Sequence, residues 1–74
     1  MIKVYTTRLG DLIGVVNLEK LGYTWKIKAR IGGKIVVLGS SCVYLAHKEK
    51  AVDQLLNTMQ VINKQNTLFN INDY

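Results

Sequence analysis

Two consecutive glycines, Gly32 and Gly33, separate two runs of residues that favour β-strands, 23–31 and 34–38. Glycine adopts positive φ at both positions of a two-residue turn without steric cost, and such a turn joins antiparallel strands. The segment therefore predicts a tight β-hairpin, whose register follows by counting outward from the turn. The predicted opposed pairs are Ile31 with Lys34, Arg30 with Ile35, Ala29 with Val36, Lys28 with Val37 and Ile27 with Leu38.

Residues that oppose one another in a hairpin share a face of the sheet, so the register also predicts which side chains are buried. One face is apolar and forms the predicted core, whereas the other combines cations with two apolar side chains. The predicted core face holds Trp25, Ile27, Ala29, Ile31, Val36 and Leu38. The predicted outer face holds Lys26, Lys28 and Arg30 beside Ile35 and Val37.

The N-terminal third of the chain predicts two further strands. Apolar residues alternate with polar ones over residues 1–7, and an apolar run follows at 12–18 after a turn-like segment. A helix over residues 9–21 is the alternative. Gly10 and Gly14 would each cost that helix about 1 kcal/mol relative to alanine, so we favour strands.

The hydrophobic period changes from two to 3.6 residues after a last strand-like segment at 42–46. Helical spacing of apolar side chains predicts an amphipathic helix that begins after His47 and stops at residues 63–66. Glu49 near the start and Lys64 near the end complement the helix dipole. The predicted apolar side consists of Ala51, Val52, Leu55, Leu56, Met59 and Ile62.

These elements predict the α+β class: a small antiparallel β-meander of four to five strands, packed by one C-terminal α-helix. A chain of 74 residues allows one domain, which we place at residues 1–65. Residues 66–74 form a C-terminal tail that is too apolar to be purely solvated. We expect this tail either to fray or to dock on a partner.

The residue inventory favours a protein that is not an enzyme. Hydrophobic residues make up 49% and charged residues 20%, which is typical of globular domains. No apolar run is long enough to cross a membrane and no signal-peptide pattern is present, so we expect a cytoplasmic protein. A single histidine and a single cysteine, Cys42, which we expect to be buried, predict no metal site and no cofactor. The five carboxylates form no recognisable catalytic set.

The segment from Tyr23 to Ile35, followed by Ser40, Tyr44 and a helix, resembles a short uncharacterised bacterial domain typified by YegP. Members of that family have an aromatic-x-hydrophobic-Lys-Ala strand, a turn that contains glycine, a second strand, a serine and a tyrosine, and then a helix. The resemblance covers residues 23–62, about half of the chain. It implies the fold alone, because the family has no established activity to carry over.

The order of strands followed by a lysine-rich helix start is also similar to the second half of a double-stranded-RNA-binding domain. That resemblance implies phosphate contacts by Lys48 and Lys50. Lys26, Lys28 and Arg30 project from one strand at intervals of about 6 to 7 Å, close to the phosphate repeat of a nucleic-acid strand. With a net charge of +5, nucleic-acid binding is therefore the alternative function. The presence of only two arginines, and of the tryptophan on the core face, counts against it.

A surplus of apolar side chains favours contact with another protein. One helix cannot cover all of Leu12, Val16, Ile35, Val37, Val43 and Leu45, so we expect a homodimer or another protein partner. The leading hypothesis is a small non-enzymatic protein-binding module. Its size and its Lys-, Ile- and Asn-rich composition are typical of phage or mobile-element factors that inhibit or modulate a host complex, as anti-CRISPR proteins do. A structural homo-oligomer that takes up a small molecule is a third hypothesis.

The candidate residues for binding a partner or a nucleic acid come from the outer face and from the helix start. They are Lys26, Lys28, Arg30, Ile35, Val37, Lys48 and Lys50.

Overall fold

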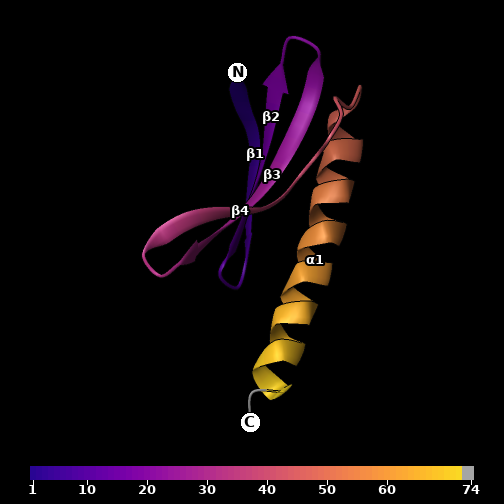
Figure 1. Ribbon diagram of the computed structural model, residues 1–74. Helices are drawn as coiled ribbons and strands as arrows, with labels where there is room; N and C mark the ends of the chain where they lie inside the picture. Colours follow the sequence, from indigo (N-terminus) through magenta and orange to yellow (C-terminus); the bar gives the residue numbers. More distant parts are fainter. Residues whose placement is uncertain (73–74) are drawn as a thin grey trace.

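A computed structural model describes the backbone of residues 1–72 and the side chains of residues 1–65. Four antiparallel strands form one sheet in the order β1-β2-β3-β4, and a single helix packs on it (Figure 1). The elements are β1 (Ile2–Leu9), β2 (Leu12–Glu19), β3 (Gly22–Ile31), β4 (Lys34–Ser40) and α1 (Lys48–Asn72). The predicted α+β meander is confirmed with four strands, and the alternative helix over residues 9–21 is wrong.

The β3–β4 hairpin has the predicted turn and most of the predicted register. Gly32 and Gly33 adopt φ angles of 58° and 79°, as a two-residue turn of this kind requires. Pairing is as predicted from the turn as far as Lys28, which opposes Val37. Beyond it the prediction is wrong, because Ile27 pairs with Gly39 and the register shifts by one residue at Leu38.

The register shift at Leu38 is a β-bulge, and Gly39 follows it. Gly39 lies against the core, where a Cβ atom would be 3.7 Å from the Trp25 ring and 3.8 Å from Ile27 Cδ1. These distances are ordinary van der Waals contacts, so the site leaves room for a Cβ atom. A bulge also bends its strand. The far end of the β3–β4 hairpin accordingly projects away from α1 (Figure 1).

The core forms where α1 crosses β2 and β3, and it is built from one face of the sheet. Gly14 allows the close approach, because a Cβ atom there would lie 2.6 Å from Met59 Sδ and 2.9 Å from Leu55 Cδ1. The buried cluster consists of Leu12, Val16, Trp25, Ile27 and Ala29 from the sheet and Ala51, Leu55 and Met59 from the helix. The helix thus covers Leu12 and Val16, two members of the predicted apolar surplus.

The predicted core face is wrong for the residues nearest the β3–β4 turn. Ile31, Val36 and Leu38 are 56%, 39% and 36% exposed. The reason is geometric, since α1 packs mainly on β1, β2 and β3, and the end of the hairpin extends beyond it. Both faces of this hairpin end are therefore open to solvent.

The segment that follows β4 differs from the predicted strand at residues 42–46. Its only ladder contact among the described residues is a bridge between Tyr23 and Leu45, with N–H···O distances of 2.8 and 2.9 Å. Cys42, predicted to be buried, is exposed because no strand holds it against the sheet.

The C-terminal helix is longer than predicted. It begins at Lys48 and continues to Asn72, past the predicted stop at residues 63–66. Asparagine is a weak helix breaker, and no glycine or proline ends the helix there. Lys64 therefore lies inside the helix and not near its end. The last turn of the helix contains no basic residue. The predicted fraying or docking of the tail at 66–74 concerns side chains outside the described residues.

Candidate binding surface

The face of the sheet opposite α1, called here the outer face, is not covered by any described helix. The ladder pairs that place Trp25 and Ile27 under the helix place the alternate residues of each strand on this side. Its members are Lys3, Thr6 and Arg8 of β1, Ile13, Val15, Asn17 and Glu19 of β2, Thr24, Lys26, Lys28 and Arg30 of β3, and Ile35, Val37 and Ser40 of β4.

The outer face brings the predicted hairpin residues together. Lys26, Lys28 and Arg30 follow one another along β3, while Ile35 opposes Arg30 and Val37 opposes Lys28. Ile35 is 65% exposed and Val37 is 52% exposed. Two apolar side chains thus stand next to a row of cations, on a surface that solvent reaches freely.

Two residues that the sequence did not single out complete this surface. Arg8 of β1 opposes Ile13 of β2, and Ile13 opposes Lys28 of β3. A row of four opposed residues therefore crosses the sheet from Arg8 through Ile13 and Lys28 to Val37. Counting outward from the turn at residues 10–11 would have paired Arg8 with Ile13. Placing Lys28 beside this pair requires the register between β2 and β3. The turn between those strands contains no pair of glycines from which the register could be counted.

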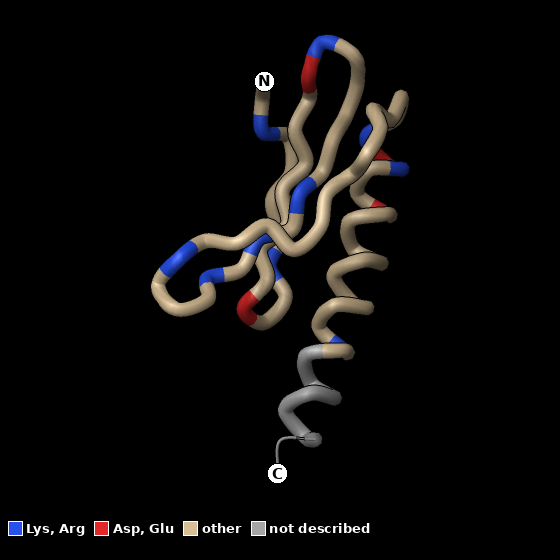
Figure 2. The backbone as a smooth tube through the Cα atoms, viewed as in Figure 1, with Lys and Arg blue, Asp and Glu red and all other residues tan. Residues whose placement is uncertain are grey.

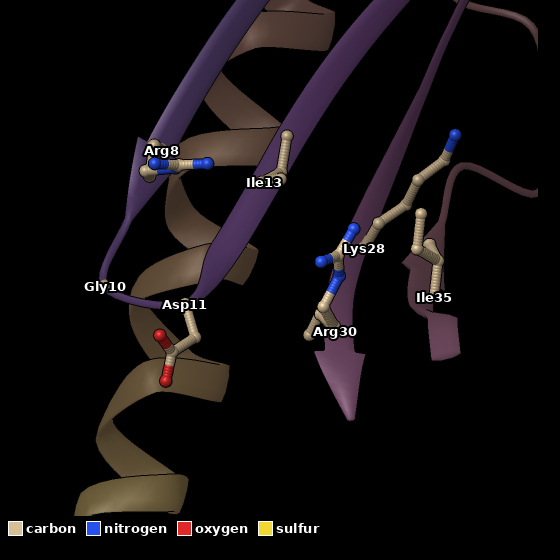
Figure 3. A pocket seen from close by; sticks show the side chains of 8 residues that line it. Arg8, Gly10, Asp11, Ile13, Lys28, Arg30 and Ile35 are labelled. Atoms are coloured by element: carbon tan, nitrogen blue, oxygen red, sulfur yellow. The ribbon is translucent and has the colours of Figure 1, made fainter. Parts of the chain in front are cut away.

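These residues surround an open hollow of about 420 Å³ between the ends of β1, β2 and β3. Arg8 and Arg30 extend their guanidinium groups toward the space beside Ile13 from opposite sides, and the carboxylate of Asp11 points away (Figure 3). The full lining is Arg8, Gly10, Asp11, Ile13, Lys28, Ala29, Arg30 and Ile35. An apolar floor under cationic side chains suits a ligand group that is itself apolar and acidic.

The cations of the outer face are not neutralised by ion pairs with the side chains of residues 1–65. The carboxylate of Glu19, at the other end of the sheet, accepts a hydrogen bond of 2.8 Å from Thr24 Oγ1. Figure 2 shows basic positions around the β3–β4 turn and the neighbouring end of β1 and β2. The positive potential of this end is therefore available to an acidic partner.

Lys48 and Lys50 do not belong to this surface. They lie in the first turn of α1, which packs on the opposite face of the sheet. That turn is at the end of the molecule where β2 joins β3, away from the β3–β4 turn (Figure 2). The predicted set of seven binding residues is thus divided between two separate surfaces, which argues against one continuous phosphate-binding row.

Other kinds of site are not found in the part of the chain that the structure describes. No group of three or more His, Cys, Asp or Glu side chains there could hold a metal ion. Within the same residues, no helix has the length and apolar character needed to cross a membrane.

Comparison with known proteins gives no relative from which a role could be transferred. No family model matches the chain, and neither the curated proteins nor the solved structures contain a significant match. The resemblance to the YegP-like domain stays a prediction, as does the similarity to a double-stranded-RNA-binding domain. Function must therefore be argued from the outer face itself.

Proposed function

We propose that the protein is a non-enzymatic protein-binding module that contacts its partner through the outer face. The observation that carries the proposal is the exposure of Ile35 and Val37, at 65% and 52%, on an uncovered sheet face beside a row of cations. Fully burying a side chain of this size contributes about 1.5–3 kcal/mol. Two of them form an apolar centre for an interface, and the surrounding cations form its polar rim.

The charge of the outer face defines the partner's chemistry. Lys26, Lys28 and Arg30 on β3, joined by Arg8 on β1, favour a protein surface that carries carboxylates around an apolar patch. The Lys-, Ile- and Asn-rich composition of the chain supports a role as a phage or mobile-element factor that occludes part of a host complex. Such a factor needs no active site, because covering the partner's surface is sufficient to inhibit it.

Nucleic-acid binding is the second candidate, and the extended cation row favours it. Lys3 and Arg8 add two cations to the predicted three, and none of the five is paired with a described side chain. The aromatic residue that could stack on a base is missing from this face, because Trp25 is 7% exposed and lies in the core. The protein partner therefore remains the better-supported proposal.

Affinity capture with matched variants tests the proposal. The tagged protein, the double variant Ile35→Ser/Val37→Ser, and the control Val61→Ser are each incubated with host-cell lysate treated with nuclease. Val61 is 55% exposed on α1, so its substitution removes a similar apolar side chain from another surface. We expect a stoichiometric protein band with the wild type and the control, and its loss with the double variant.

Two results would overturn the proposal. Equal retention of the band by the double variant would show that Ile35 and Val37 are not in the interface. Capture of nucleic acid alone, lost on nuclease treatment and weakened steeply by salt, would instead support the second candidate.

A further inference from the structure

The edge strand β4 carries apolar side chains on both sides. Ile35 and Val37 are exposed on the outer face, and Val36 and Leu38 are 39% and 36% exposed, with no described side chain of α1 packed over the hairpin end. Apolar residues on both sides of a strand are typical of strands whose two faces are both covered. Among the described strands, β4 has β3 along one edge and no neighbour along the other.

The other edge strand, β1, is protected in the ways that natural sheets use. Its pairing with β2 is interrupted by a register shift between Lys3 and Tyr5, and it carries Lys3 and Arg8. Bulges and charged side chains hinder the addition of a further strand. In β4 the stretch from Ile35 to Val37 has neither, since its bulge comes only at Leu38. The two edges therefore differ in their capacity to accept a strand.

The hairpin turn determines which main-chain groups of β4 face the open edge. In a two-residue turn the flanking residues, here Ile31 and Lys34, exchange both hydrogen bonds. The main-chain N–H and C=O groups of successive residues point to opposite edges of a strand. Ile35 and Val37 therefore present these groups to the open edge. These are four strong hydrogen-bonding groups on one short apolar stretch.

We propose that β4 pairs with β4 of a second copy, antiparallel and about a two-fold axis that passes beside Val36. In this register Ile35 of one copy and Val37 of the second copy exchange both main-chain hydrogen bonds. Val37 of the first copy and Ile35 of the second copy do the same. Val36 lies directly opposite Val36 of the second copy. The two four-stranded sheets become one continuous sheet, and the two outer faces lie side by side. The inference goes beyond the proposed function, which concerns a different partner.

A second copy fits this edge because β4 is self-complementary about Val36 and meets no like charge there. Pairing centred on Val36 sets Lys34 opposite Leu38, so no like charges face one another across the new edge. Lys28 and Arg30 of the second copy lie three strand spacings apart, about 14 Å, beyond the Debye length of about 8 Å at physiological salt. The helix leaves the edge clear, because the hairpin end projects away from it (Figure 1).

Sedimentation velocity over a dilution series, with charged variants at the symmetry position, tests the proposal. The wild type is expected to form a dimer of twice the 8.4 kDa chain mass. Val36→Lys and Val36→Glu each place like charges directly opposite and are expected to sediment as monomers. An equimolar mixture of the two is expected to restore the dimer mass, because lysine then faces glutamate. Circular dichroism checks that each variant is folded.

The control is Ile2→Lys, which charges a residue 61% exposed on the opposite edge strand and is expected to leave the dimer intact. A wild type that is monomeric at every concentration overturns the proposal. So does a dimer that survives Val36→Lys, or a mixture of the two charged variants that stays monomeric. Because Val36 is not on the outer face, failure here would leave the proposed partner interface untouched, and the capture experiment tests that interface separately.

Discussion

The indole Nε1–H of Trp25 donates a hydrogen bond of 3.1 Å to Oε1 of Gln54, and this bond ties β3 to α1. The main-chain N–H of Trp25 donates to Ser41 Oγ at 3.1 Å, and its carbonyl accepts from Ser41 N at 2.9 Å. One buried residue thus connects the sheet, the helix and the segment between them. The core face and the uncovered outer face are both fixed by this arrangement.

Replacing Gln54 with alanine should destabilise the protein by about 1 kcal/mol, because the Trp25 indole N–H would lose the acceptor that Gln54 supplies. Urea unfolding measures the change, with the fluorescence of Trp25, the sole tryptophan, as the signal. Gln60→Ala, at an exposed position of α1, is the control and should change stability by less than half as much. Equal effects of the two substitutions would show that the bond contributes nothing.

Gly14→Ala should be destabilising by about 1–3 kcal/mol, since its Cβ atom would meet Met59 Sδ at 2.6 Å. Met59→Ala removes that sulfur and should itself cost about 2–5 kcal/mol. In the double variant the alanine at position 14 occupies part of the space that Met59 leaves, so the combined loss should be smaller than the sum. Strict additivity in urea unfolding would contradict the close contact between β2 and α1.

Gly33→Ala should lower stability by about 1–2 kcal/mol, because the φ of 79° at this position is unfavourable for residues with a Cβ atom. Space is not the cause, since nothing lies within 4 Å of an added Cβ. Gly33→Asn is the matched variant, because asparagine tolerates this backbone region. Thermal unfolding should rank asparagine above alanine, and the reverse order would argue against the turn geometry.

Cys42 should react with a thiol reagent in the folded protein as fast as in the urea-unfolded chain, because it is exposed. Ellman's reagent measures both rates. Slow reaction in the folded state, accelerated by urea, would restore the original expectation of a buried cysteine.

The sequence was sufficient for the fold class and for the part of the outer face nearest the glycine turn. Gly32 and Gly33 determine the register locally, so the opposition of Lys28 and Val37 could be counted out. The bulge at Leu38 could not, because counting outward from the turn assumes that each residue opposes one residue, whereas a bulge sets two residues opposite one.

Other features could not be predicted from the sequence, because they depend on how the sheet and the helix are placed relative to one another. The periodicity marked Ile31 and Val36 as core residues, but it could not show that α1 ends its coverage at β3 and leaves them exposed. In the same way, Arg8 and Ile13 lie on the binding surface because of the β1–β2 and β2–β3 registers. Lys48 and Lys50 do not lie on it, because α1 packs on the other face of the sheet.

The most direct test of the outer face as the binding surface is site-specific photocrosslinking. A benzophenone side chain replaces Val37 on the outer face in one protein and Val61 on α1 in the other, two positions of similar exposure at 52% and 55%. Each protein is irradiated in nuclease-treated host lysate. We expect an adduct with a protein other than a second copy from position 37 and none from position 61. The absence of such an adduct from position 37, or its formation from position 61 alone, would contradict it.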